Sequence, residues 1–367
     1  MLTFLPAGLA LDNGNKPFIL QADGRSAYYP DNPSSTGAKT AKDISINLGA
    51  PGNTVTCTIP RLAGGRIWFS IGSPLTFLIN PGPALVEPSI FNASDPNHYI
   101  NFGFAEFTYN ASQVFVNISY VDFVGPPISL ELTDTTNNVQ RVAGMPSYGP
   151  QTIASGLIAQ TAKDGRRWSS LIVNDNNGKL LRILSPNSGI TLNPDWFKTY
   201  WTDYVDRVFS RYASNPLTVN TQAVWQDVQG RVSNNQFVFG TNGQNNPQPT
   251  FGKPSAKDIF SCNDGPFATG SNAETNVIIP RLSAAFNRST LLKSNITPNG
   301  TNPTQYYQET TTNHYSRIVH AANLDGKGYT FPYDDVTPDG GVGQEGAVFS
   351  FSPKSLLVTV GGRNAHV

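Results

Sequence analysis

The chain has 367 residues, of which 38% are hydrophobic and 11% aromatic, enough for a substantial core and for two domains rather than one. Its 25 basic and 25 acidic residues cancel, and no cluster of lysine or arginine stands out along the chain. We therefore expect no nucleic-acid partner and no membrane partner, because nucleic acids and anionic membranes both require a basic surface. No apolar run approaches the ~20 residues of a membrane span, so we expect a soluble chain whose export signal, if it has one, lies outside this sequence.

Short runs rich in β-branched and aromatic residues fill positions 40–135, and Gly, Pro and Asn separate them. Examples are NTVTCTIPRL, GGRIWFSI, LTFLI and VFVNISYV. Repeated short strands with turn signals between them predict a β-sandwich or barrel. A passage rich in Pro and Gly at 144–151 then predicts a domain boundary.

Beyond that boundary the sequence predicts a mixed α/β domain over 145–322. Residues 171–184 are expected to form a β-hairpin. A helix is predicted with Asn193 as N-cap and Pro194 at its first position, ending at Asn215-Pro216. Further helices are predicted within 276–294 and 303–323, and residues 326–336 and 346–362 return to strand character. We therefore expect the mixed domain to be inserted into a β-domain formed by residues 1–144 and 323–367.

The composition is poor in charge, at 14%, and rich in Asn, Ser, Thr, Gly and Pro, a texture common in extracellular β-rich proteins that meet carbohydrate. Cys57 and Cys262 lie far apart and form no C-x-x-C motif, so they either form one disulfide or are two buried thiols. Of the four histidines only His314 and His320 are close, and this spacing would not place them on one helix face. We expect no metal centre. Six Asn-x-Ser/Thr sequons point toward secretion, at Asn92, Asn110, Asn117, Asn287, Asn295 and Asn299.

Two acidic residues, Glu106 and Asp122, stand in segments that otherwise have strand character, and alternation places each on a face with apolar or aromatic neighbours. No lysine or arginine lies between Arg66 and Arg141, so no cation close in sequence can neutralise them. One interpretation is that both acids are exposed to solvent or paired with Arg66 or another remote cation. The functional interpretation is a carboxylate pair for glycosidic bond cleavage, one acid protonated and the other ionised.

The connection between the two strands decides whether these acids can cooperate. A tight two-residue turn would place Glu106 opposite Asn117, with Asp122 about 17 Å along the strand and on the other face of the sheet. An odd-numbered connection or a β-bulge would instead place Glu106 opposite Tyr120, with Asp122 on the same face. The separation then approaches the ~6.5–9.5 Å of an inverting glycosidase. The functional interpretation therefore predicts an odd register.

Four segments occur in the order in which similar segments line an acidic cleft in the thaumatin-like fold: GGRIWFS, AEFTYN, SYVDFVGPP and GYTFPYDDV. The chain resembles that fold over residues 65–336. Plant thaumatin-like proteins contain many disulfides, whereas this chain has two cysteines and the large segment 145–322. It therefore resembles more closely glycoside hydrolase family 64, the endo-β-1,3-glucanases of the laminaripentaose-producing type. These enzymes combine a thaumatin-like barrel with a mixed α/β domain around a broad groove.

This resemblance implies that Glu106 is the general acid and Asp122 the general base in an inverting hydrolysis of β-1,3-glucan, such as laminarin or curdlan. It implies short laminari-oligosaccharides as products, no metal or organic cofactor, and a secreted enzyme that we expect to be a monomer. Asn110, which heads a sequon, is then expected to carry no glycan. The residues implied to contact the sugar are Thr108, Asn110, Tyr120, Arg66, Asp334 and Asp335.

Two other functions remain open. A non-catalytic thaumatin-like protein would use the same acidic cleft to hold β-1,3-glucan without cleaving it, and a structural surface protein would leave the acid pair unexplained. No G-x-S-x-G or P-loop motif occurs, and the G-x-G-x-x-G that starts at Gly341 leads into a strand-like run, which indicates a turn. Trp196 and Trp201 are expected to pack in the core. The tryptophans that could stack on glucose rings are Trp68, Trp168, Trp196, Trp201 and Trp225.

Overall fold

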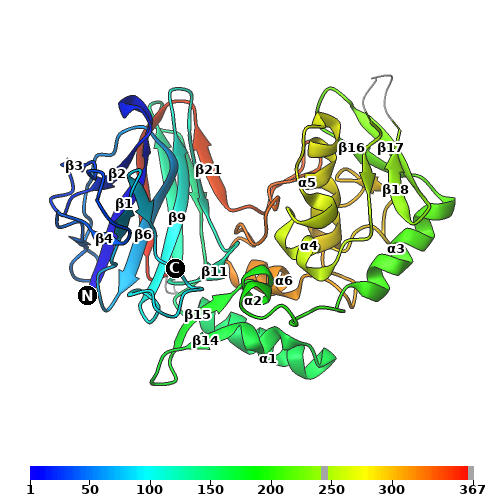
Figure 1. Ribbon diagram of the computed structural model, residues 1–367, viewed down its shortest axis with the longest axis horizontal. Helices are drawn as coiled ribbons and strands as arrows, with labels where there is room; N and C mark the ends of the chain where they lie inside the picture. Colours follow the sequence, from blue (N-terminus) through cyan, green and yellow to red (C-terminus); the bar gives the residue numbers. More distant parts are fainter. Residues whose placement is uncertain (241–246, 363–367) are drawn as a thin grey trace.

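The computed structural model describes residues 1–240 and 247–362. Figure 1 shows two lobes side by side, with strands on the left and a mixture of helices and strands on the right. The division into two domains at residues 144 and 323 stays a prediction. The mainly β architecture is confirmed, but no sheet among the described strands closes into a barrel.

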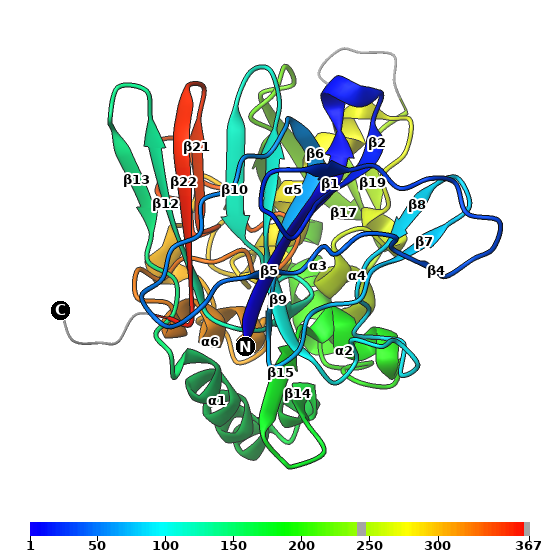
Figure 2. The same cartoon turned by 90° about the vertical axis from the view of Figure 1, so that its left-hand side faces the viewer.

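The left lobe is a sandwich of two antiparallel sheets, seen side by side in Figure 2. The larger sheet has the strand order β21-β10-β9-β6-β1-β2-β3, with β5 paired to β1, and the smaller has the order β13-β12-β22. Alternating side chains such as Phe107 and Val116 fill the space between the sheets together with Leu130 and Leu132. The strands of the larger sheet are β1 (Leu2–Ala10), β2 (Lys16–Leu20), β3 (Ala27–Tyr28), β5 (Ile46–Asn47), β6 (Leu62–Ile71), β9 (Asn101–Tyr109), β10 (Val114–Ile118) and β21 (Ala347–Ser350). Those of the smaller sheet are β12 (Ile128–Asp134), β13 (Val139–Val142) and β22 (Pro353–Val360).

The C-terminal strands complete both sheets, as the sequence predicted for residues 346–362, whereas the predicted strand character of 326–336 is wrong: that segment forms turns with one isolated bridge at Tyr329. β21 pairs with β10, and β22 pairs with β12, so the chain returns to the sandwich after residue 323. A small sheet of β4 (Ala38–Lys39), β7 (Leu78–Asn80) and β8 (Ala84–Val86) lies beside the sandwich.

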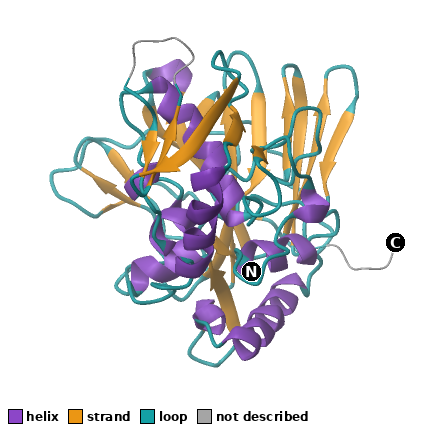
Figure 3. Ribbon diagram, turned by 90° about the vertical axis from the view of Figure 1, so that its right-hand side faces the viewer, coloured by secondary structure: helices purple, strands orange, loops and turns teal. Residues whose placement is uncertain are grey.

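The segment 145–322 contains the six α-helices among the described residues. Figure 1 shows them in the right-hand lobe and beneath it, and Figure 3 views the molecule from that side. Helices α3 (Thr202–Ser214) and α5 (Ala273–Asn287) pack against the sheet β19-β18-β17-β16-β20. The hairpin of β14 and β15 pairs with β11 (Phe123–Val124) at the junction of the two lobes. The strands are β14 (Ile172–Asn174), β15 (Leu180–Leu184), β16 (Leu217–Asn220), β17 (Asp227–Ser233), β18 (Gln236–Phe239), β19 (Thr250–Phe251) and β20 (Ile296–Thr297). The helices are α1 (Gly149–Asp164), α2 (Pro186–Leu192), α3 (Thr202–Ser214), α4 (Ala256–Ser261), α5 (Ala273–Asn287) and α6 (His314–Ala322).

The predicted helix starting at Asn193 begins later than expected. Asn193 caps the C-terminal end of α2, residues 194–201 form turns in which Phe197 has φ of 61°, and α3 starts at Thr202. Its predicted end at Asn215 is confirmed, as is the hairpin at 171–184.

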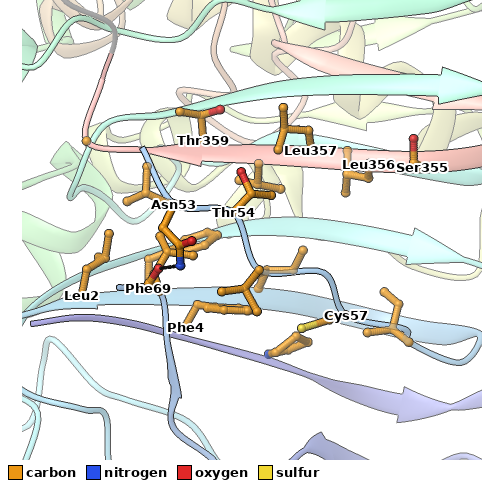
Figure 4. Close-up of a pocket in the computed structure, with 18 of the residues that line it drawn as sticks. Leu2, Phe4, Asn53, Thr54, Cys57, Phe69, Ser355, Leu356, Leu357 and Thr359 are labelled. Carbon is orange, nitrogen blue, oxygen red and sulfur yellow. Dashed lines mark hydrogen bonds between the residues drawn. The ribbon is translucent and has the colours of Figure 1, made fainter. Parts of the chain in front are cut away.

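A cavity of about 1040 Å³ lies inside the sandwich, between β6 and β9 on one side and β22 on the other. Figure 4 shows Phe4, Phe69 and Leu356 among its lining side chains. Cys57 lines it as well, and Cys262 is buried elsewhere; both are free thiols, so the disulfide alternative is wrong.

Candidate active site

Pairing between strands β6 and β9 brings Arg66 and Glu106 together. The register places Arg66 directly opposite Glu106. A register shift between Leu62 and Gly65 precedes this pair, and Gly64 within it has φ of 54°, a left-handed conformation that favours glycine. A β-carbon on Gly65 would lie 2.5 Å from the ring of Phe107, so only glycine lets that ring pack against the strand.

The guanidinium of Arg66 is held between two carboxylates. Its Nε and Nη2 donate to Oε1 of Glu106, at 3.2 Å and 3.0 Å. Its Nη1 donates to Glu87, which the sequence analysis did not single out. The guanidinium also lies over the ring of Phe104, 4.7 Å from its centroid, and 5.5 Å from that of Trp68. These contacts fix the cation on the face of the sheet that points away from the cavity of Figure 4, because Ile67 and Phe69 line that cavity from alternate positions.

The prediction of an odd register between β9 and β10 is wrong. Glu106 pairs with Asn117, which is the register of the tight turn. Strand β10, however, ends at Ile118, and the chain bends before Asp122, so strand alternation does not extend to that residue. The backbone carbonyl of Asp122 then accepts a hydrogen bond from the amide of Ser185, 2.9 Å away, at the start of α2.

Asp122 nevertheless belongs to the same electrostatic cluster as Arg66 and Glu106. Burial raises the pKa of Asp122, Arg66 opposes that rise, and Glu106 adds to it. Burial likewise raises the pKa of Glu87 against the opposing effect of Arg66. For Arg66 burial disfavours the charge, but Glu87 and Glu106 outweigh it and raise the pKa of the guanidinium. Three acids therefore share one cation.

Thr108 follows Glu106 on β9, and Asn110 comes directly after the end of that strand; both are half-buried. Oδ1 of Asn110 accepts from the amides of Ser112 at 2.8 Å and Gln113 at 2.9 Å, which closes the hairpin to β10. A contact of either side chain with sugar stays a prediction.

Tyr120, which the resemblance implied to contact the sugar, is buried, with only 3% of its surface exposed. Its hydroxyl donates to Oδ1 of Asn323 at 3.3 Å, and its carbonyl accepts from the hydroxyl of Tyr315 at 2.7 Å. Tyr120 therefore has almost no exposed surface with which to contact a sugar in this structure.

The resemblance implied that Asp334 contacts the sugar, but its side chain is fully buried. It accepts from Arg288 Nη2 at 3.1 Å, lies 3.0 Å from His320 Nε2, and accepts from the hydroxyl of Thr330 at 2.7 Å. A buried carboxylate held in this way cannot reach a sugar. Its neighbour Asp335 is exposed and accepts from the hydroxyl of Tyr329 at 3.0 Å, so it keeps its predicted role as a proposal.

Three of the tryptophans are core residues: Trp68, Trp168 and Trp201 are at most 2% exposed. Trp196 and Trp225 are half-buried and pack against the core. The core prediction is confirmed for Trp201, and Trp68 is excluded as a stacking platform because Phe77, Phe102 and Phe104 surround it.

Two residues near the acids were missed by sequence reasoning. Glu87 lies in a loop-like segment with no sequence pattern around it. Only its contact with Arg66 in the structure identifies it. Asn117 lies opposite Glu106, and its buried Oδ1 has no hydrogen-bond partner within the described ranges 1–240 and 247–362. The signal for Asn117 was available, because the tight-turn alternative named that pair.

A search of the described part of the chain finds no group of three or more His, Cys, Asp or Glu side chains suited to a metal ion. None of the helices described is long and apolar enough to cross a membrane.

Comparison with known proteins identifies the family of the chain. The profile of a family described as Beta-1,3-glucanase, glycoside hydrolase family 64, matches residues 2–360. Glucan endo-1,3-beta-glucosidases from Cellulosimicrobium cellulans and Arthrobacter sp. (strain YCWD3) are each 29% identical over 292 residues, 77% of this chain. The chain spans about half the length of these curated relatives, 50% in each case.

Solved structures show the same fold. The crystal structure of a laminaripentaose-producing beta-1,3-glucanase in complex with laminaritetraose superposes with a TM-score of 0.85 at 29% identity, covering 98% of this chain and 94% of that one. A beta-1,3-glucanase domain from Clostridium beijerinckii gives a TM-score of 0.75 at 23% identity, covering 98% and 93%. With the family profile covering nearly the whole sequence, the chain belongs to glycoside hydrolase family 64, the Beta-1,3-glucanase family.

Proposed function

We propose that this protein is an endo-acting, inverting β-1,3-glucanase that cleaves laminarin or curdlan into short laminari-oligosaccharides. The observation that carries the proposal is the Arg66–Glu106 pair with Asp122 in the same charge cluster, in a chain of the Beta-1,3-glucanase family. The complex of a related enzyme with laminaritetraose supports this class of substrate.

In the proposed mechanism Glu106 donates a proton to the leaving glycosidic oxygen. Asp122, ionised, takes a proton from a water molecule that attacks the opposite face of the anomeric carbon, so the configuration inverts. Half-burial supports Glu106 as a group that a bound sugar could shield from water. Thr108, Asn110 and Asp335 would hydrogen-bond sugar hydroxyls.

Hydrolysis of laminarin by the wild type and by E106Q and D122N variants tests the activity. Each substitution should lower the rate at least ~100-fold, the lower end of the range for general acid–base catalysis. Curdlan binding by all three proteins, with no oligosaccharide released by any, would instead identify a glucan-binding protein.

The individual roles need a second substrate, an aryl laminari-oligosaccharide whose leaving group requires no proton. E106Q should cleave it at a rate near that of the wild type, because the missing acid is not needed. D122N should fail on it unless azide replaces the base-activated water. The reverse pattern would exchange the two roles.

We further propose that the protein acts outside the cell as a monomer. Its low charge content and six sequons support export, and the family acts on a polysaccharide. Light scattering coupled to size-exclusion chromatography should give a mass near 39.6 kDa. A mass twice as large would contradict the monomer.

A further inference from the structure

The proposed mechanism assigns no role to Glu87, although it contacts Arg66 beside Glu106. It follows directly after β8, in a segment outside the sheet that carries Glu106. Its carboxylate accepts a hydrogen bond from Nη1 of Arg66, and the other two guanidinium nitrogens, Nε and Nη2, donate to Glu106. The Arg66 and Glu87 side chains are 29% and 31% exposed, so both charges are partly withdrawn from water.

The geometry creates a difficulty for an acid catalyst. A general acid must hold its proton at the working pH, whereas a guanidinium that donates twice to a carboxylate favours the ionised form. Arg66 is always charged, and its Nε and Nη2 both donate to Oε1 of Glu106. Glu87 supplies a negative charge on the other side of the same guanidinium.

We infer that Glu87 is a positioning residue that acts through Arg66: it holds the guanidinium and offsets its charge, so that Glu106 keeps the proton it donates. This inference rests on the proposed function, because it presupposes that Glu106 is the acid. It assigns to Glu87 a part in setting the upper pH limit of hydrolysis.

Other charged and titratable groups surround this cluster. Arg66 comes from β6, Glu87 follows β8, and Asp122 lies between β10 and β11. The hydroxyl of Tyr315 on α6 interacts electrostatically with Asp122. A change confined to Glu87 leaves Asp122 and Tyr315 in place, so it should affect the acid more than the base.

The test is the pH profile of kcat/KM on laminarin for the wild type and E87Q. The high-pH limb reports the acid, and removal of the charge on Glu87 should move it about one unit lower, as expected for the loss of one nearby charge at a partly exposed site. Activity above the wild-type limb should then fall about tenfold, while the low-pH limb stays. The matched control is E131Q, because Glu131 pairs with Arg141 at 2.8 Å, is 30% exposed, and lies on the smaller sheet. Its profile should coincide with that of the wild type.

A second variant, R66Q, should move the high-pH limb in the opposite direction, because it removes the cation that favours ionised Glu106. A limb that does not move upward in R66Q would remove the premise that Arg66 favours ionised Glu106, and would overturn the inference even if E87Q fails to fold. A uniform loss of activity in E87Q with no shift of the limb would make Glu87 merely structural and overturn the inference. A wild type that releases no oligosaccharide at any pH would contradict the proposed function itself, which separates the two failures.

Discussion

Replacement of Asp334 by asparagine should destabilise the protein without weakening sugar binding. The carboxylate is fully buried and contacts Arg288, which is itself 3% exposed, together with His320 and Thr330. D334N leaves the charge of Arg288 buried without its acid. Removal of one partner from a buried ion pair costs about 3–5 kcal/mol of unfolding free energy.

The pH dependence of the unfolding free energy gives a second value for the contribution of Asp334 to stability. Burial by itself raises the pKa of Asp334, but His320, Arg288 and the hydrogen bond from Thr330 outweigh it and lower the pKa from 3.8 to about 2. A shift of this size corresponds to about 2 kcal/mol. Because the folded pKa is the lower one, the contribution is complete above pH of about 4 and is lost as the pH falls toward about 2.

Urea unfolding of the wild type, D334N and the neighbouring D335N at pH 7 and pH 3 measures both effects. D334N should lose about 3–5 kcal/mol at pH 7, with a smaller difference from the wild type at pH 3. D335N should unfold close to the wild type, because Asp335 is exposed. The reasoning is refuted if D334N is as stable as the wild type and instead raises KM for laminarin.

Three further predictions concern the acid cluster and its surroundings. Burial raises the pKa of Asp122 above 3.8, and a general base must be ionised to act. The low-pH limb of kcat/KM should therefore lie above 3.8, and a limb at or below that pH would contradict the assignment. Y120F loses the bond to Asn323 and should cost about 1 kcal/mol in urea unfolding while KM is unchanged; a raised KM would restore Tyr120 to the sugar site. Since Cys57 and Cys262 are free, dithiothreitol should leave Tm unchanged, and a fall in Tm on reduction would reveal a disulfide.

Local sequence signals predicted those parts of the fold that depend on neighbouring residues. The strand runs, the hairpin at 171–184 and the end of α3 at Asn215 follow from alternation, turn residues and the Asn-Pro pair. The return of the C-terminal strands was also predicted, because strand character resumes after the mixed segment. Helix α1 was missed: its buried positions are sparse, with Ile153 and Leu157 as its large apolar ones.

The errors at the site arise where the chain departs from regular structure. The sequence analysis extended the strand alternation of β10 through Asp122. The strand ends at Ile118, however, and a bend in the chain places Asp122 outside that alternation. Tyr120 and Asp334 were assigned by resemblance, and only packing shows that both are buried. Glu87 could not be found from sequence, because its partner Arg66 is 21 residues away on β6 and two short strands, β7 and β8, lie between them.

The stereochemistry of the first product tests the central claim most directly. Laminarin hydrolysis by the wild-type protein can be followed by proton NMR from the first minutes, before the released sugars mutarotate. The account predicts that the α-anomer of the new reducing end appears first, because Asp122 directs water to the face opposite the leaving oxygen. Initial release of the β-anomer would require a nucleophile in place of a base and would contradict the assignment of Glu106 and Asp122 as an inverting pair.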